Sequence, residues 1–252
     1  MPMDFKQSTA VANRFVFLET TGSTNADLVA LATSKPIEFP NFSVLVAASQ
    51  TAGRGRVGRQ WVSPAGKSLA ISVLIKPEWQ LEQFGWLPLV AGVAMKSAVQ
   101  SALPEREVQL KWPNDVLIEG KKVSGILSEL IPGGNSVVVG AGINLTLEKA
   151  ELPIADSTSL LLEGWSGTAD DFLASYLEKL KAMLVDFEKA ELEVRSECTT
   201  IGLPVRATFP DGSEQVGTAV GIDATGRLLI SLPAGETLLA VSAGDIEHLR
   251  HN

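Results

Sequence analysis

The sequence predicts an α+β protein with a large first part of mixed strands and helices and a small second part of short strands. Two observations support this prediction. Apolar runs of strand length alternate with segments of helical periodicity up to about residue 200. Beyond that point only short apolar runs separated by glycine turns remain, which is typical of a small barrel. We therefore expect one domain over residues 1–200 and another over 201–252.

The first part is expected to contain both kinds of element in alternation. Its helices are expected at three places that show helical apolar spacing. The first begins near Thr24, where Asp27 completes a capping-box pattern, and the second covers 87–103. The third begins with a capping-box pattern at Thr168 and Asp171 and runs through Phe187. Its strands are expected at 15–19, 43–48, 69–75, 108–112, 116–118, 123–131 and 136–145.

The second part is expected to hold strands that are separated by turn residues. Asp211-Gly212, Thr225-Gly226 and Ala234-Gly235 are the turn signals. The strands are expected at 203–209, 215–222, 228–232 and 238–241.

Composition excludes several classes of protein. The 252 residues are 45% hydrophobic and 20% charged, as expected of a globular protein with a substantial core. A formal net charge of −8 argues against general nucleic-acid binding. The single cysteine, Cys198, excludes an intramolecular disulfide framework and suits a reducing compartment.

We expect neither a signal peptide nor a membrane span in this chain. The long apolar window 84–103 contains Pro88 and Lys96, so a buried helix fits it better than a span. We expect a cytoplasmic protein. No Cys/His cluster indicates zinc, and the two histidines, His248 and His251, are expected to be solvent-exposed.

The segment Gly53-Arg-Gly-Arg-Val-Gly-Arg59 places three arginines and three glycines in seven residues of an acidic chain. Glycines permit close backbone approach, and successive backbone N–H groups can form an anion-binding nest. Arginines supply permanently charged, planar donors for phosphate or carboxylate. The segment predicts a loop that closes over an anionic ligand, although taken alone it is equally typical of a solvated turn.

Four further segments stand at predicted strand ends or turns, where functional sites are often built. They are Gly22-Ser-Thr-Asn25, Lys111-Trp-Pro-Asn-Asp115, Lys122-Val-Ser-Gly-Ile126 and Gly140-Ala-Gly-Ile-Asn144. With the loop that runs from Gln50 to Arg59, and in this order, they resemble the biotin protein ligases. The resemblance extends from about Phe15 to the C-terminus.

The resemblance implies a fold and an activity. The fold would be a class II aminoacyl-tRNA synthetase-like catalytic domain, a mixed sheet flanked by helices, followed by a small C-terminal SH3-like β-barrel. The enzyme would activate biotin with ATP to biotinyl-5′-AMP, releasing pyrophosphate, and transfer biotin to a lysine of a biotin carboxyl carrier domain. Mg²⁺ would assist, because both reactants of the first step are anions.

The resemblance also assigns residues to roles. Those expected to bind biotin are Ser23, Thr24, Asn25, Gln50, Gly53, Arg54, Lys122, Gly125 and Ile126. Those expected to bind ATP or the adenylate are Arg56, Arg59, Trp61, Lys111, Asn114, Lys122 and Asn144. Those expected to be catalytic are Lys122, Arg56, Lys111 and Asp115, with Asp115 also expected to hold Mg²⁺. The segment 147–157 is expected to cover adenine.

Each assignment has a structural alternative. Lys122 could be an exposed lysine of a hairpin turn, Trp61 a core aromatic at a strand start, and Asn114-Asp115 a plain turn. At the level of function, two alternatives are a lipoate or octanoate ligase or transferase and a non-catalytic biotin-binding sensor. Whether the protein forms a homodimer is left open. Only about fourteen residues precede the first expected strand, too few for a helix-turn-helix domain, so we expect the monofunctional type of ligase without DNA binding.

Overall fold

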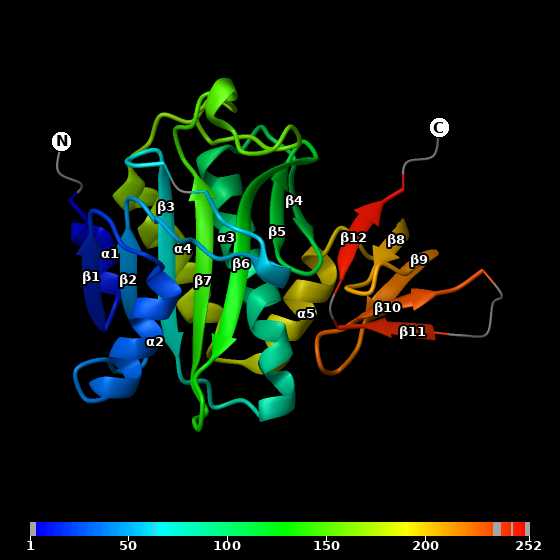
Figure 1. The fold of residues 1–252 in the computed structure, drawn as a ribbon, viewed down its shortest axis with the longest axis horizontal. Helices are drawn as coiled ribbons and strands as arrows, with labels where there is room; N and C mark the ends of the chain where they lie inside the picture. Colours follow the sequence, from blue (N-terminus) through cyan, green and yellow to red (C-terminus); the bar gives the residue numbers. More distant parts are fainter. Residues whose placement is uncertain (1–3, 63, 234–237, 243, 250–252) are drawn as a thin grey trace.

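A mixed sheet organises the first part of the chain. The structure is a computed structural model that describes residues 4–62, 64–233, 238–242 and 244–249. Within these residues seven strands form one sheet in the order β1-β2-β3-β7-β6-β5-β4 (Figure 1). Its strands are β1 (Arg14–Leu18), β2 (Ser43–Ala47), β3 (Ser68–Ile75), β4 (Val108–Lys111), β5 (Asp115–Ile118), β6 (Lys121–Leu130) and β7 (Val137–Asn144). Only β1 and β2 pair in parallel, so the predicted mixed sheet is confirmed.

Helices cover both faces of this sheet (Figure 1). They are α1 (Lys6–Val11), α2 (Thr24–Ser34), α3 (Leu87–Ala102), α4 (Ala169–Met183) and α5 (Phe187–Glu197), with short 3₁₀ turns at Arg56–Gly58, Leu81–Trp86 and Lys149–Glu151. Alternate strand residues face opposite helices. Val44 and Val73 belong to the large core under α3 and α4, whereas Leu45 and Leu74 pack with Leu28 of α2. Among the described helices, none is long and apolar enough to cross a membrane.

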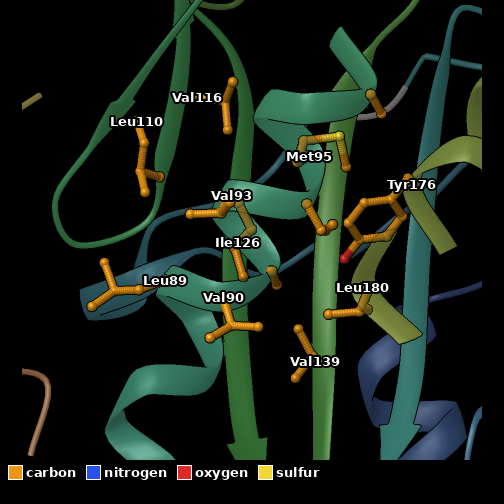
Figure 2. Packing of buried hydrophobic residues seen from close by; sticks show 14 of the residues in the cluster. Leu89, Val90, Val93, Met95, Leu110, Val116, Ile126, Val139, Tyr176 and Leu180 are labelled. Carbon is orange, nitrogen blue, oxygen red and sulfur yellow. The ribbon is translucent and has the colours of Figure 1, made fainter. Parts of the chain in front are cut away.

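The large core is filled by side chains from α3, α4 and the sheet (Figure 2). Its members shown there include Leu89, Val90, Val93, Met95, Leu110, Val116, Ile126, Val139, Tyr176 and Leu180. The Tyr176 hydroxyl is fully buried among them and has no hydrogen-bond partner in the described structure. Burial raises the pKa of this phenol.

The two predicted helix caps differ in their outcome. Ser23, the N-cap of α2, makes no side-chain capping bond, and Asp27 instead accepts a hydrogen bond from the Thr21 hydroxyl. The predicted capping box there is therefore wrong. The Thr168 cap is confirmed, because its hydroxyl accepts from the Asp171 backbone N–H at 3.1 Å.

The predicted helix from Thr168 through Phe187 is two helices. The first, α4, ends at Met183, and α5 begins after Asp186. The Asp186 carboxylate accepts from the Lys189 backbone N–H at 3.2 Å and so caps the second helix. The apolar periodicity continues across this break, which concealed it in the sequence.

The second part is a five-stranded antiparallel sheet in the order β11-β10-β9-β8-β12, counted over the described residues. Its strands are β8 (Pro204–Thr208), β9 (Glu214–Ile222), β10 (Leu228–Ser231), β11 (Leu238–Val241) and β12 (Asp245–His248). The last of these was not predicted, because it holds a single strongly apolar residue, Ile246. The predicted Ala234-Gly235 turn lies outside the described residues.

The N-terminal helix α1 was also not predicted, since it spans only six residues. A tertiary contact stabilises it. The Asp170 carboxylate accepts hydrogen bonds from the Gln7 and Ser8 backbone N–H groups, both at 2.9 Å, and from the Ser8 hydroxyl at 2.6 Å.

Two tryptophans join the parts. Trp86 Nε1 donates to the Ala224 carbonyl at 2.9 Å, and Trp112 Nε1 donates to the Gly226 carbonyl at 3.1 Å. Both carbonyls belong to the turn between β9 and β10. A Cβ built on Gly85 would lie 2.1 Å from the Thr225 carbonyl oxygen, so this contact requires glycine. The turn is thereby fixed against the β4 side of the large sheet.

Candidate active site

A cavity of about 460 Å³ lies between the large sheet, the loop 54–62 and the start of β12, and its volume is within the usual range of small-molecule sites. It is lined by every residue to which the sequence assigned a role, except Gly53. They are Ser23, Thr24, Asn25, Gln50, Arg54, Arg56, Arg59, Trp61, Lys111, Asn114, Asp115, Lys122, Gly125, Ile126 and Asn144. Gly53 lies at the base of the loop, where a Cβ would meet the Trp61 carbonyl oxygen at 2.3 Å.

The inner end of the cavity is a buried polar cluster at the start of α2. Gln50 Oε1 accepts from the Thr24 backbone N–H at 2.9 Å and from its hydroxyl at 3.2 Å. Ser72 Oγ lies 2.8 Å from Thr24 Oγ1. Such groups can recognise a compact polar ligand through several directed hydrogen bonds.

In the middle of the cavity the Trp61 indole packs on two facing glycines. Gly125 and Gly142 are partners in the register of β6 and β7, and the Trp61 indole lies over them. A Cβ on Gly142 would approach the indole to 2.2 Å. Trp61 belongs to the loop and not to a strand, and its buried Nε1 has no partner among the described residues.

The outer end is rich in positive charge. Lys122 Nζ lies 2.5 Å from Asp115 Oδ1, an ion pair without the geometry of a hydrogen bond. Lys122 stands in β6 with its side chain largely buried, whereas the neighbouring Lys121 is exposed. The alternative of an exposed lysine in a hairpin turn is therefore wrong for Lys122.

Arg56 and Lys111 are cations without a carboxylate partner in the described part of the chain. Burial lowers the pKa of both groups, and the nearby Asp115 only partly opposes this effect. Removing cations from water without a counter-ion is unfavourable. An anion bound in the cavity would supply the missing charge.

The segment Gly53–Trp61, here called the arginine loop, forms a small hairpin over the cavity. Its base is closed by the Trp61 N–H donating to the Gly53 carbonyl at 3.0 Å, and the Gly55 N–H donates to the Arg59 carbonyl at 2.7 Å. Gly58 turns the chain with φ of 72°.

The three arginines of the arginine loop differ in their partners. Arg54 Nη1 lies 2.9 Å from Glu129 Oε1, and Arg59 pairs with Asp245 of β12. Arg56 points to the cavity without such a partner among the described residues. The loop is thus held on two sides with one arginine left for a ligand.

Side-chain oxygen atoms that could bind a metal ion also line the cavity. Asn144 donates through Nδ2 to the Thr158 carbonyl at 2.9 Å, while its buried Oδ1 has no partner in the described structure. Asn114 Nδ2 donates to the Ile126 carbonyl at 2.7 Å, which fixes the turn before Asp115. The described residues include no group of three or more His, Cys, Asp or Glu side chains able to hold a metal. A hard cation here would need ligands from a bound anion as well.

Several residues in or beside the cavity were missed by sequence reasoning. Ser72 is a buried polar residue within an apolar run and gives no signal. Asp245 and Ile246 come from the second part of the chain, which only the tertiary fold brings to the site. Glu129 follows Gly125 and Leu127 on the same face of β6, and this alternation is a signal that could have found it.

The segment after β7 also reaches the cavity, through Pro153, Ile154 and Ser157. It is tied to β6 because the Lys122 N–H donates to the Asp156 carbonyl at 2.9 Å and the Thr158 N–H donates to the Lys122 carbonyl at 2.9 Å. Its expected contact with adenine stays a prediction.

His248 is not the freely exposed side chain expected from the sequence. It is half-buried, and its Nε2 lies 3.0 Å from Thr200 Oγ1. Burial, with a smaller effect of the positive Lys111, lowers its pKa to about 4. His251 lies outside the described residues.

Comparisons with known proteins agree with this arrangement. Residues 20–145 match the profile of the Biotin/lipoate A/B protein ligase family, and residues 200–249 match the Biotin protein ligase C terminal domain. A biotin--[acetyl-CoA-carboxylase] ligase of Mycobacterium tuberculosis is 40% identical over 238 residues, covering 91% of this chain and 87% of the relative. One from Paracoccus denitrificans is 32% identical, with 88% and 96% covered.

Solved structures show the same relationship. The biotin protein ligase of Aquifex aeolicus in complex with biotin and ATP superposes with a TM-score of 0.75 at 29% identity, covering 95% of this chain and 100% of the other. The Leishmania major enzyme in complex with biotinyl-5-AMP superposes with a TM-score of 0.64 at 25% identity, covering 92% and 99%.

Proposed function

The chain belongs to the biotin/lipoate A/B protein ligase family, and from this premise we propose how its cavity performs the reaction of a biotin protein ligase. The enzyme activates biotin with ATP and then transfers it to a protein lysine. The observation that carries the proposal is the pair of half-buried cations, Arg56 and Lys111, that have no carboxylate partner within 4.0 Å in the described structure and face the cavity. They would lie beside the phosphates of ATP and the carboxylate of biotin.

Biotin would lie with its ring at the inner polar cluster and its carboxylate at the outer end. Thr24 and Gln50 offer hydrogen bonds for the ring, and the aliphatic chain would lie between these groups and Lys122, beside the Trp61 indole that covers Gly125 and Gly142. Ile126 also borders the cavity, but its side chain belongs to the large core (Figure 2), so the predicted contact of this side chain with the aliphatic chain is not proposed. This orientation brings the carboxylate towards Lys122.

In the first step a carboxylate oxygen of biotin forms a bond to the α-phosphorus of ATP. The bond from that phosphorus to the bridging oxygen breaks, and pyrophosphate leaves with the electron pair. Both reactants are anions, so preorganised positive charge lowers the barrier. Lys122 would bind the biotin carboxylate and the α-phosphate, with Arg56 and Lys111 supplying further charge. Arg59 would lie near the phosphates.

The oxygen donors of the site fit a magnesium ion held jointly with the triphosphate. The Asn144 Oδ1, unpartnered in the described structure, and the Asp115 carboxylate are hard ligands of the kind Mg²⁺ prefers, and Asn114 lies in the turn directly before Asp115. Bound there, the ion would neutralise phosphate charge as pyrophosphate leaves. The residues themselves would orient the nucleotide and keep Lys122 in place.

In the second step the ε-amine of an acceptor lysine attacks the acyl carbon of biotinyl-5′-AMP. An amide bond forms, AMP leaves with the bonding electrons, and the amine loses its proton. The arginine loop would exclude water from this reactive intermediate before the acceptor arrives. The acceptor would be a biotin carboxyl carrier domain. A cytoplasmic location, the absence of DNA binding and a homodimer stay predictions.

The deciding experiment is the intact mass of two carrier domains, one for biotin and one for lipoate. Each is incubated with the protein, Mg-ATP, and biotin or lipoate. A biotin-sized gain on the biotin carrier alone is the expected result. A lipoate-sized gain on the other carrier would move the chain to the sister activity, and biotin binding without any gain would indicate a sensor.

A further inference from the structure

Glu129 occupies a position between the arginine loop and the inner end of the cavity. One carboxylate oxygen, Oε1, lies 2.9 Å from Arg54 Nη1. The other, Oε2, accepts a hydrogen bond from Asn25 Nδ2 at 2.8 Å. The Glu129 side chain keeps 27% of its exposure, so both interactions are partly shielded from water. A single carboxylate therefore bridges a loop at the mouth and a residue at the floor.

Asn25 is itself held on every side. Its Nδ2 also donates to the Leu127 carbonyl at 3.1 Å, and its Oδ1 accepts from the Ser72 hydroxyl at 2.6 Å. A Cβ built on Gly140 would lie 2.2 Å from Asn25 Oδ1, so the amide packs directly on the β7 backbone. Asn25 is only 5% exposed and cannot readily turn away. Glu129 is thus anchored to a rigid part of the site.

The same contacts continue to the residues proposed for the biotin ring. Ser72 Oγ lies 2.8 Å from Thr24 Oγ1, and Thr24 donates to Gln50 Oε1. An unbroken series of polar contacts runs from Arg54 through Glu129, Asn25 and Ser72 to Thr24. Networks of this kind act as a unit, because each member fixes the rotamer of the next.

We propose that Glu129 is a positioning residue that holds Arg54, and with it the arginine loop, over the cavity before any ligand binds. It also connects the loop mechanically to the site of the biotin ring. The effect of this anchoring on the reaction, namely retention of biotinyl-5′-AMP, rests on the proposed function. The anchoring of the loop itself does not depend on the proposed function. Glu129 touches neither substrate in this arrangement: it acts on the loop through Arg54, and Asn25 only fixes its other carboxylate oxygen.

The anchoring is tested on the ligand-free protein by trypsin, which cleaves after arginine. The three loop arginines are natural reporters of loop opening, and mass spectrometry assigns the cuts. In Glu129→Gln, cleavage in the arginine loop should become about fivefold faster, the effect expected from loss of a partly shielded, charge-assisted contact. Arg54→Gln removes the other half of the pair and should accelerate cleavage after Arg56 and Arg59 to the same degree.

The matched control is Glu214→Gln. Glu214 pairs with Arg206 in the second part of the chain at 3.6 Å, away from the cavity, so this change also removes a carboxylate facing an arginine. Loop cleavage in the control should equal that of the wild type. Thermal unfolding of all variants separates local loop release from general loss of stability, since the latter accelerates cuts throughout the chain.

The consequence for the reaction is tested by the release rate of biotinyl-5′-AMP. We expect Glu129→Gln to release it about fivefold faster in the wild-type background and to have no further effect in Arg54→Gln, because Glu129 acts through Arg54. Unchanged loop cleavage in Glu129→Gln would overturn the inference, as would equal effects on release in both backgrounds. Failure to form any adenylate would instead count against the proposed function and leave the trypsin result valid.

Discussion

Lys122 and Asp115 face each other because of a bulge in β6. Asp115 pairs with Gly125 and Val116 with Ser124, but the next pair is Leu117 with Lys122, so Val123 is the extra residue. The shift places Lys122 on the same face as Gly125 and Asp115, and Lys121 on the opposite face. Bulges that redirect a side chain are common beside active sites. One inserted residue thus decides which of two adjacent lysines enters the cavity.

The first prediction concerns the side chain of Lys122. Lys122→Ala should lower the rate of adenylate formation by about a hundredfold or more, as removal of a preorganised charge at a developing anion does. Biotin binding should weaken far less, because the ring contacts at Thr24 and Gln50 remain. Single-turnover formation of biotinyl-5′-AMP and calorimetric biotin binding measure the two effects. Lys121→Ala is the matched control and should behave as the wild type; equal losses in rate and binding for Lys122→Ala would contradict the assigned role.

A second prediction concerns the metal. Asp115→Asn should raise the Mg²⁺ concentration needed for half-maximal adenylate formation by about tenfold, as a neutral amide replaces an anionic ligand. Biotin affinity without ATP should be nearly unchanged. Titration of Mg²⁺ at fixed ATP measures this, with the exposed Asp211→Asn as control. An unaltered Mg²⁺ dependence in Asp115→Asn would exclude this carboxylate as a ligand.

The third prediction is a pH dependence of stability from His248. Its pKa is lowered from 6.5 to about 4 in the folded protein, first by burial and then by Lys111. Between these two values the unfolded chain binds more protons, so the contribution of neutral His248 is complete above pH 6.5 and falls as the pH approaches 4.

Urea unfolding at several pH values measures the effect. His248→Gln should show a smaller decrease in the free energy of unfolding over this window, by about 1 kcal/mol after allowance for partial exposure. The variant and the wild type should show the same pH dependence above pH 7. Parallel curves down to pH 4 would contradict the prediction.

A fourth prediction concerns the buried hydroxyl of Tyr176. Because it has no partner among the described residues, Tyr176→Phe removes an unsatisfied polar group and should raise the free energy of unfolding by about 1 kcal/mol. Tyr176→Ala, which leaves a cavity, should lower it by about 3–5 kcal/mol. Chemical denaturation of both variants measures this. A loss of stability in Tyr176→Phe would show that the hydroxyl finds a partner such as buried water.

Much of the fold could be predicted because local pattern and tertiary structure agree. Uniformly buried strands such as β2 and β3 appear as short apolar runs, and α3 as a long apolar segment. Elements held by tertiary contact could not be predicted. Helix α1 depends on Asp170, far along the chain, and β12 depends on pairing with β8.

Residues of the candidate site could be predicted where they belong to sequence motifs. Residues that only the tertiary fold brings to the site could not be predicted. Arg56 and Lys122 stand in motifs that can be recognised in sequence. Glu129 and Asp245, which hold the arginine loop, are ordinary acidic residues until the chain folds. The face of Lys122 depends on a bulge that no sequence pattern announced.

The cavity wall formed by Gly244, Asp245 and Ile246 makes each part of the chain incomplete without the other. Residues 1–200 contribute the cations that line the cavity, and residues 201–252 contribute this part of its wall. Fused to two different proteins, fragments of these two ranges would regain lysine labelling only when those proteins bring them together. The docking of the two tryptophans on the β9–β10 turn therefore makes this chain a natural starting point for a split reporter of protein association.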